Sequence, residues 1–478
     1  MTATAMPPTR PRRSPARHLT VAERTAAGRA ARRVAPRTAQ GRWEPAPDRE
    51  PALAILERQG EHRVADLLPI RYGRMVTSPF AFFRGAAAVM AADLSAAPRT
   101  GLHAQLCGDA HLSNFGGFAA PDRRLVFSIN DFDETLPGPF EWDVKRLMAS
   151  FAVAGRSSGF SPAKRSAIVL AAAAAYRVAM HRFAGMSSLD VWYTRLDVDE
   201  IARRFGGYAR AKELRTLRRA ADKAETKDTL KAMARLTQVV DGERQFISEP
   251  PVLVRLDDLV GPEESQRFKG EASTLLRSYM ASLADDRRVL VDRYRFADIA
   301  RKVVGVGSVG TRAWVVLMLG RTQEDPLLLQ FKEAQASVLE PYLGASRYKH
   351  HGQRIVEGQR LMQAASDILL GWQRTPGFDG TARDYFVRQL WDKKGSAEVE
   401  AMTSRGLLLY GEMCAWTLAR AHARSGDSVA LAAYLGRSDT FDRAMAEFAE
   451  AYADQNERDH AALRQAIADG DVTAIVGV

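Results

Sequence analysis

The sequence predicts an α+β protein with two lobes, one mostly helical and one built on a small antiparallel sheet. Between about residues 140 and 290, long stretches place apolar residues at helical spacing, which is typical of amphipathic helices. Between Lys302 and Lys332, a glycine-rich segment is followed by two apolar runs, which favours paired strands. A chain of 478 residues is also long enough to divide into two or three domains.

The composition is that of a folded globular chain. No stretch reaches the roughly 18 uncharged apolar residues that a membrane span needs, since Tyr176 and Arg177 interrupt the most apolar helix. The first residues, MTATAMPPTRPRRS, lack the apolar centre of a secretory signal. Two cysteines, Cys107 and Cys414, provide no disulfide framework. We therefore expect a cytoplasmic protein with no membrane partner.

Positive charge is concentrated in residues 1–50, where eleven arginines face four acidic residues. This arm therefore holds +7 of the net +11, and the other 428 residues share +4. Its Pro/Arg/Ala-rich composition cannot bury enough apolar surface to fold alone. No interleaved aromatics or zinc pattern accompany the charge, which argues against a nucleic-acid partner. We expect a basic, largely flexible arm that lies on the acidic surface of its own domain.

Helical patterns follow this arm. Two of them cover residues 52–68 and 78–95, and Ser78 and Pro79 are a suitable cap and first residue for the second. Apolar residues at helical spacing then predict helices over 140–156 and 162–183. The mixed charges of residues 208–237 indicate a solvated helix face rather than a binding site.

Most of the candidate chemistry lies between Cys107 and Arg146. An apolar run, LVFSI, ends in acidic residues there, which is typical of a buried strand that brings carboxylates to a polar site. Carboxylate and amide oxygens are ligands that suit Mg²⁺. The candidate site residues of this segment are Asp109, His111, Asn114, Asp131, Asp133 and Glu134.

A second informative segment contains Gly305, Gly307 and Gly310 in a GxGxxG pattern. In a dinucleotide-binding fold this pattern opens a helix, whereas here AWVVLML follows, which is strand-like. The glycines therefore predict a hairpin turn whose backbone N–H groups can approach phosphate oxygens. The next strand, LLLQFKEA, contains Lys332.

The motifs GDAHLSN and NDFDE resemble the catalytic loop and metal-binding segment of kinase-like phosphotransferases, especially the aminoglycoside and choline kinase branch. The resemblance implies that Asp109 accepts the proton of the attacking hydroxyl, while Asn114 and Asp131 are metal ligands. It makes His111 a candidate for acceptor contact and Asp133 for metal or water contact. Two further positions are Cys107, where those families have His, and Asp143, which resembles their buried, loop-bracing Asp.

The same resemblance gives roles to the glycine-rich segment. Gly305, Gly307, Ser308 and Gly310 would cover the nucleotide phosphates, and Lys332 would contact them. A following helix would supply Glu357 to pair with Lys332. The segments DILLGW and RDYFVRQLW would be the remaining strands, with Leu390 to Asp392 near the hinge between the lobes.

The order of these parts is unusual, because Asp109 precedes Gly305 by about two hundred residues. A circularly permuted two-lobed, protein-kinase-like fold accommodates this order, and residues 407–427 would form the helix that leads into the catalytic loop. The predicted divisions are a basic arm (1–50), a helical large lobe (51–290), a small lobe (291–395) and C-terminal helices that return to the large lobe (396–478).

The segments RYGRM, SPFAFFRGAA, CGDAHLSNFG, NDFDE and WDVKR, in this order, also resemble the bacterial family catalogued as domain of unknown function 2252. Together the motifs lead us to expect a phosphotransferase that uses ATP and Mg²⁺, with an acceptor that the sequence does not identify. The sequence is equally silent on the oligomeric state.

Two other functions stay open. A kinase-like fold can persist as a catalytically silent nucleotide-binding or interaction module, because fold does not fix function. GDAH also resembles a metal loop of metallophosphoesterases. The nine histidines, however, form no GNH or GHxH motif, so that class lacks its ligands.

Overall fold

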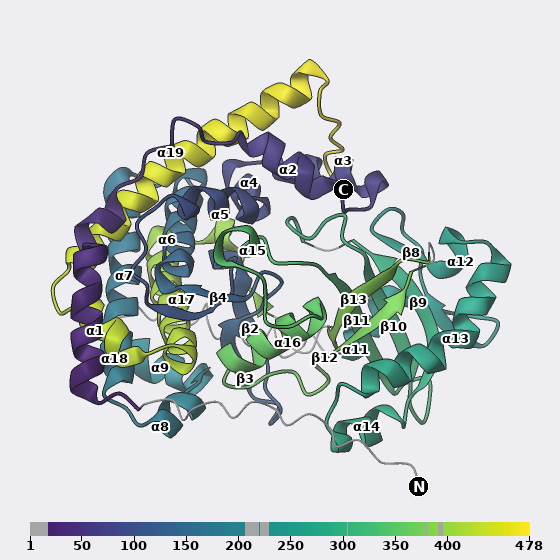
Figure 1. Cartoon of the computed structure of the whole chain (residues 1–478). Helices are drawn as coiled ribbons and strands as arrows, with labels where there is room; N and C mark the ends of the chain where they lie inside the picture. Colours follow the sequence, from purple (N-terminus) through teal and green to yellow (C-terminus); the bar gives the residue numbers. More distant parts are fainter. Residues whose placement is uncertain (1–17, 206–218, 220–228, 304, 378–379, 391–394) are drawn as a thin grey trace, which may run out of the picture.

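Two parts of different make-up lie side by side in the protein, a body of long helices and a six-stranded antiparallel sheet with its own helices (Figure 1). This arrangement, seen in a computed structural model, confirms the predicted α+β class. The structure describes residues 18–205, 219, 229–303, 305–377, 380–390 and 395–478.

The helical body is centred on three helices, α6 (Phe140–Ser157), α7 (Pro162–Ala184) and α17 (Ser404–Ser425). α7 packs along α17 and also touches α6. By length and composition alone, α7 could cross a membrane, but its apolar residues Ile168, Val169, Ala172, Ala173, Tyr176, Ala179, Met180 and Phe183 are buried in the main core. We therefore interpret α7 as a core helix.

Two C-terminal helices, α18 (Ser428–Leu435) and the long α19 (Thr440–Asp469), complete this body. α18 packs on α7, and α19 runs across both α6 and α7 (Figure 1). Two smaller helices, α8 (Ser188–Tyr193) and α9 (Val198–Phe205), lie at its lower end in the view of Figure 1.

The basic arm differs from its prediction beyond residue 17, while residues 1–17 lie outside the described part. Helix α1 (Val21–Val34) forms because Thr20 and Glu23 make a reciprocal capping box. It packs on α18, and a Cβ added at Gly28 would lie 2.1 Å from the carbonyl oxygen of Ala430. The small side chain at position 28 therefore permits close helix contact, which composition alone did not indicate.

Short helices connect the arm to the first strand. The predicted cap is present, because Ser78 Oγ accepts a hydrogen bond from the N–H of Ala81 at 3.0 Å. The helix predicted over 78–95 is divided in two at Ala86. These elements are η1 (Arg37–Gly41), α2 (Ala52–Gly60), η2 (Ala65–Leu67), α3 (Leu68–Met75), α4 (Pro79–Gly85) and α5 (Ala87–Ser95).

The segment with the acidic residues forms two small antiparallel sheets at the centre of the molecule. β1 pairs with β4, and the second sheet has the order β14-β2-β3-β5. The elements are β1 (His103–Leu106), η3 (Leu112–Asn114), β2 (Phe115–Ala119), β3 (Leu125–Ile129), β4 (Leu136–Pro139), β5 (Leu196–Asp197) and β14 (Gly395–Ser396).

The six-stranded sheet has the order β12-β13-β11-β10-β9-β8. The glycine segment is the turn between β9 and β10, and Lys332 lies on β11, as predicted. The first of the last two strands begins at Gly371 rather than at 367, since Asp367 makes a turn with Leu369. The strands are β8 (Leu253–Arg255), β9 (Arg295–Lys302), β10 (Ala313–Leu319), β11 (Pro326–Ala334), β12 (Gly371–Pro376) and β13 (Ala382–Gln389).

Both faces of this sheet are covered by residues predicted to belong to the large lobe. Tyr279 and Leu283 pack on one face, and Leu236 and Phe246 on the other. Residues of the described segment 229–290 therefore pack on the sheet, although the predicted large lobe includes them. The elements are α11 (Thr229–Leu236), β6 (Thr237–Val240), β7 (Glu243–Phe246), α12 (Leu256–Leu259), α13 (Pro262–Met280) and α14 (Asp285–Val291).

Within the described residues, the segments that follow β11 and β13 connect the sheet to the helical body. After β11 the chain passes through α15 (Glu340–Leu343) and α16 (His351–Met362) before β12. After β13 it reaches β14 on the second small sheet, and the 3-10 turn η4 (Val399–Ala401) then leads into α17. Helix α16 contacts β11, β12 and β13 on one side and β1 and α17 on the other, so it bridges the two parts.

Candidate active site

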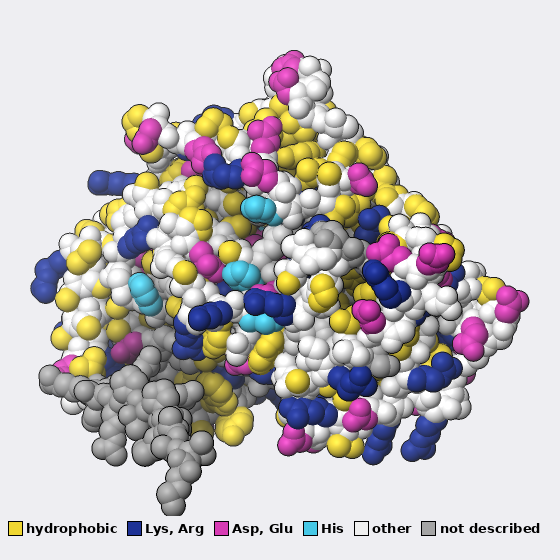
Figure 2. Space-filling view, turned by 45° about the vertical axis from the view of Figure 1, so that its right-hand side comes forward, with side chains coloured by type: hydrophobic (Ala, Val, Ile, Leu, Met, Phe, Trp, Pro, Cys, Tyr) yellow, Lys and Arg dark blue, Asp and Glu magenta, His cyan; other side chains and the backbone are white. Residues whose placement is uncertain are grey.

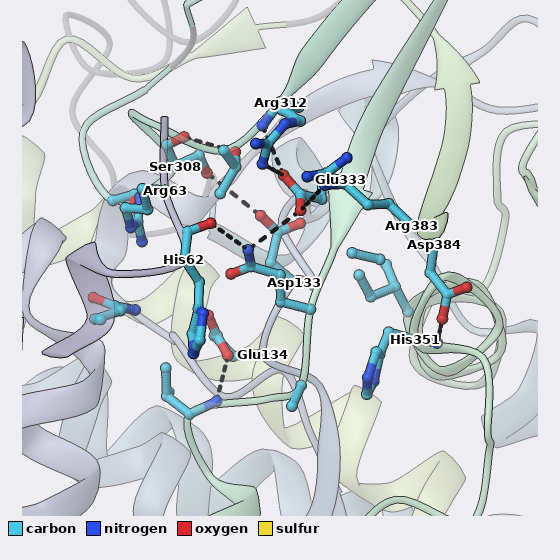
Figure 3. Close-up of a pocket in the computed structure, with 18 of the residues that line it drawn as sticks. His62, Arg63, Asp133, Glu134, Ser308, Arg312, Glu333, His351, Arg383 and Asp384 are labelled. Carbon is cyan, nitrogen blue, oxygen red and sulfur yellow. Dashed lines mark hydrogen bonds and ion pairs between the residues drawn. The ribbon is translucent and has the colours of Figure 1, made fainter. Parts of the chain in front are cut away.

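A cleft of about 800 Å³ lies between the glycine hairpin, the acidic segment and the short helices near the N-terminus. Histidine, basic and acidic side chains lie together near the centre of one face of the molecule (Figure 2). Figure 3 shows a pocket lined by Asp133, Ser308, Arg312 and Glu333. Among the residues that line the cleft are Arg63, Arg84, Asp109, Asp131, Asp133, Glu134, Gly307, Ser308, Arg312 and Glu333.

Lys332 meets the acidic segment at this cleft. Its ammonium pairs with Asp133 and lies 3.9 Å from Oδ2 of Asp131. Only 2% of Lys332 is exposed, and a buried ammonium is costly unless a carboxylate balances it. Burial and the neighbouring Asp131 both raise the pKa of Asp133, while Lys332 opposes them. The two sequence segments that were predicted to share a site are therefore adjacent.

The glycine hairpin is held over the acidic segment. Ser308 Oγ lies 3.4 Å from Oδ2 of Asp133. Arg63 donates to the carbonyl oxygens of Gly307, at 2.8 Å, and of Val309. Gly305 and Gly310 have φ of +67° and +91°, which glycine adopts readily. Gly307 and Ser308 line the cleft, whereas Gly305 and Gly310 shape the turn.

Asp109 faces the cleft and is held by Arg146 of α6. Nε of Arg146 lies 2.9 Å from Oδ1 of Asp109, and Nη2 lies 2.8 Å from it. Burial raises the pKa of Asp109, and the attraction of Arg146 opposes this rise. His111 Nε2 lies 3.6 Å from Oδ2 of Asp109. Burial holds the pKa of His111 well below its ordinary value, so this ring is neutral.

Asn114 supports the loop from behind. Its Nδ2 donates to the carbonyl oxygen of Asp109 at 2.9 Å, which leaves Oδ1 as the atom available to a cation. The backbone oxygen of Asn114 accepts from the N–H of Asn130 at 2.8 Å. The loop that contains Asp109 is thus tied directly to the segment that contains Asp131.

Asp143, at the start of α6, fixes the beginning of the same loop. Its carboxylate accepts from the N–H groups of Cys107, at 2.8 Å, and Gly108, at 3.0 Å. His422 of α17 lies 3.3 Å from it. Burial and the Asp143 charge raise the pKa of Cys107 well above its ordinary value, so this thiol is protonated and unreactive.

Glu134 is the acid of this segment that the sequence motifs left without a role. Its Oε2 accepts from the N–H of Val338 at 2.8 Å (Figure 3). Burial raises its pKa to about 7, an effect that the hydrogen bond from Val338 partly opposes. Glu134 therefore changes protonation near neutral pH.

The predicted partner of Lys332 is wrong. Glu357 pairs with Arg360 on its own helix at 3.2 Å, and the acids beside Lys332 are Asp131 and Asp133. The α16 side chain that reaches the acidic segment is Arg354, which donates to the carbonyl oxygens of Asp133 and Thr135 at 2.7 and 2.6 Å. A cation thus occupies the side of α16 where an anion was expected.

Leu390 also differs from its predicted role. It lies in an apolar cluster with Val315, Leu317 and Leu328, and it is not among the residues that line the cleft. The rest of the predicted hinge, Trp391 and Asp392, lies outside the described residues. His111, Asn114 and Lys332 also stand behind the cleft surface rather than on it.

The donor set fits a magnesium–phosphate group better than a bare cation. Within the described residues, no three histidine, cysteine or acidic side chains are placed to hold a metal ion by themselves. Mg²⁺, however, is usually bound through one or two carboxylates together with phosphate oxygens. Asp131 and Asp133 would supply those carboxylates, and Asn114 Oδ1 and Asp109 lie on the connected loop.

Several residues of the site were missed by sequence reasoning. Arg63 and Arg84 line the cleft, and Arg146 and Arg354 orient its acidic groups. Arg84 stands in SPFAFFRGAA, whose apolar residues identify a helix but give no sign that its arginine lines a cleft with Asp109, 25 positions later. An isolated arginine in a helix is far more often a surface residue.

With this geometry in view, comparison with known proteins gives one match. A model of the bacterial family described as "Uncharacterized protein conserved in bacteria (DUF2252)" matches residues 63–466. The chain belongs to this family. No curated protein and no solved structure matches the chain. The matched region includes the acidic segment, the glycine hairpin, Lys332 and α17, so the DUF2252 family region contains every side chain described at the cleft except His62, Glu61 and Gln59.

Proposed function

We propose that this DUF2252 protein is a phosphotransferase that uses ATP and Mg²⁺. The observation that supports this most is the meeting of Lys332 with Asp131 and Asp133 below the glycine hairpin, although 199 residues separate Lys332 from Asp133. A lysine, two carboxylates and a glycine-rich turn are what phosphoryl transfer needs, because it proceeds by positioning and charge neutralisation.

The role of each residue follows from its place. Gly307 and Ser308 present the hairpin to the phosphates, and Lys332 orients them once they replace its carboxylate partner. Asp131 and Asp133 would hold Mg²⁺, which neutralises phosphate charge when it is bound. Asp109 positions the acceptor hydroxyl and takes its proton, a task that its raised pKa favours.

We further propose that the fold is a circularly permuted form of the kinase-like arrangement. The contact between α17 and β1 supports this. Ser425, the last residue of α17, accepts a hydrogen bond from the N–H of Gln105 in β1 at 3.1 Å. A Cβ at Gly426 would lie 2.8 Å from the carbonyl oxygen of His103. The end of α17 therefore abuts the strand that precedes the Asp109 loop, as it would if the chain ran directly between them.

A second function, nucleotide binding without transfer, is favoured by one observation. In this structure Lys332 is paired with Asp133 rather than with an acid of α16. The lysine proposed to bind phosphate and a carboxylate proposed to bind the metal therefore neutralise each other. A site that remained in this state would bind phosphates weakly and would not complete a transfer.

Calorimetric titration of ATP, with and without Mg²⁺, tests the proposal. We expect Mg²⁺-dependent binding that weakens at least about tenfold in Lys332→Ala, since one charged phosphate contact is lost. Lys164→Ala, an exposed lysine of α7, is the matched control. Absence of Mg²⁺-dependent binding in the wild type would refute the proposal. ATP binding without ADP formation across a broad acceptor panel would favour the silent module.

A further inference from the structure

Arg84 is a cleft residue to which neither the sequence motifs nor the proposed mechanism gives a role. It lies in the last turn of α4 and lines the cleft together with Asp109, Gly307 and Ser308. Within the described residues its side chain makes no hydrogen bond or ion pair, and its Nε is buried without a partner. Burial lowers the pKa of its guanidinium, and the charges of Glu400 and Asp109 oppose this change.

The other arginines of the cleft are engaged. Desolvated cations are normally paired, so an arginine without a partner is the exception that needs a reason. The engaged pairs are Arg63 with the carbonyl oxygens of Gly307 and Val309, Arg312 with Glu333, Arg374 with Asp384, and Arg383 with Glu333.

Arg84 stands between two parts of the proposed site. Its carbonyl oxygen would lie 3.1 Å from a Cβ at Gly307, so α4 touches the glycine hairpin directly. Its charge also acts on Asp109, whose pKa it lowers, and on the neighbouring His111. The backbone of Arg84 therefore contacts the turn that would cover the phosphates, and its side chain shares the cleft with the residue that would meet the acceptor.

We propose that Arg84 binds the phosphoryl group while it is being transferred. This inference rests on the proposed function. In that step the acceptor oxygen forms a bond to the terminal phosphorus as the bond from phosphorus to the bridging oxygen breaks. The electron pair of the broken bond leaves with the diphosphate, and the acceptor proton passes to Asp109. A planar guanidinium with several N–H donors is suited to the equatorial oxygens, where charge accumulates.

A phosphoryl mimic separates this role from nucleotide binding. We would titrate ADP with Mg²⁺ into the protein, with and without tetrafluoroaluminate, which occupies the position of the transferring group. In the wild type we expect the mimic to tighten ADP binding about tenfold or more. It supplies the negative charge of the transferring group, which the donors of the site are already placed to bind.

The decisive comparison is between two Arg→Gln variants. Arg84→Gln should bind ADP within about twofold of the wild type but lose most of the tightening, because only the donors to the mimic are removed. Arg374→Gln removes a cleft arginine that is paired with Asp384, and this variant should keep the full tightening of ADP binding by the mimic. If Arg84→Gln melts early, Arg84→Lys retains the charge without the planar fork and should also lose most of the tightening.

Four results would overturn the inference. Full tightening in Arg84→Gln, or equal loss in both variants, would show that Arg84 has no specific role. ADP binding without tightening in the wild type would refute the role of Arg84 but leave nucleotide binding intact. No ADP binding in the wild type would remove the proposed function and this inference together.

Discussion

The ammonium of Lys332 on β11 pairs with the carboxylate of Asp133, which lies 199 residues earlier and just after β3. This pair joins the six-stranded sheet to the helical body at the floor of the cleft. Because Lys332 is almost fully buried, its charge needs a partner, and that partner is supplied by carboxylates that we propose as metal ligands. Under the proposed function, ATP and Mg²⁺ would therefore exchange one set of charge contacts for another.

Removing the Asp133 charge should destabilise the protein. In Asp133→Asn, the ion-pair partner that Lys332 keeps among the described residues is Asp131, at 3.9 Å. We expect the free energy of unfolding to fall by about 1.5–3 kcal/mol, the range for hydrogen bonds to charged groups. Urea denaturation measures this loss. Asp258→Asn, an exposed acid of α12, should change stability by less than about 0.5 kcal/mol. Equal effects in the two variants would contradict the importance of the pair.

Asp143 should govern the order of the Asp109 loop. Asp143→Ala leaves the buried N–H of Cys107 and that of Gly108 without their acceptor, so we expect a loss of about 2–4 kcal/mol. The isosteric Asp143→Asn keeps one acceptor oxygen and should lose about half as much. Amide hydrogen exchange at Cys107 and Gly108 should accelerate in the same order, and unchanged protection there would refute this role.

Gly108 and Gly101 separate crowding from backbone strain. Both have positive φ, +85° and +73°, so alanine at either position costs about 1–2 kcal/mol. A Cβ at Gly108 would also lie 2.3 Å from the carbonyl oxygen of Glu134, whereas nothing lies within 4 Å of one at Gly101. Thermal unfolding should therefore show Gly108→Ala to be clearly the less stable variant. Similar melting temperatures would mean that the acidic segment yields to the added methyl group.

Glu134 should make stability depend on pH near neutrality. Its pKa of about 7 in the folded protein exceeds the ordinary value of 4.5, so the folded state retains a proton that the unfolded chain has lost. This group therefore lowers the free energy of unfolding as pH rises from about 4.5 to 7. Glu134→Gln, which cannot ionise, should be more stable than the wild type by about 1–3 kcal/mol at pH 8.

The control for Glu134→Gln is the same comparison with the wild type at low pH. At pH 4.5 the wild-type carboxyl is protonated, and the two proteins should then have nearly equal unfolding midpoints in urea. A difference that stays constant between pH 4.5 and 8 would show that Glu134 does not titrate in this range.

Strands and turns of the sheet were predictable because their signals are local. AWVVLML and LLLQFKEA are apolar runs bounded by turn residues, and they became β10 and β11. The pairing of Lys332 was not predictable in the same way. A glutamate in the next helix fits the sequence pattern expected for a partner of Lys332. Whether Lys332 pairs with Glu357 or with Asp133 depends on which α16 side chains face the acidic segment. Arg354 occupies that position, and its charge favours carboxylates on the opposite wall.

The N-terminal arm shows that amino-acid composition alone does not predict whether a segment forms a packed helix. Its many arginines and prolines are typical of a flexible segment, yet α1 forms and packs on α18. The deciding features are few, namely the capping box of Thr20 and Glu23 and the small residue Gly28 at the contact. Arg84 was missed for a related reason, since its partnerless state can be recognised only when the neighbours of its side chain are known.

The contacts of α17 have a consequence for biosynthesis. Tyr410 donates to the carbonyl oxygen of Leu112 across 298 residues, and His422 reaches Asp143 across 279. A ribosome that adds about 5–20 residues per second would release the Asp109 loop roughly 15–60 s before the helix that anchors it. During that interval the nascent chain exposes the Asp109 loop without its contacts to α17. A chaperone that shields this segment would protect it until α17 is made. A message truncated before α17 would leave the Asp109 loop without the helix that anchors it.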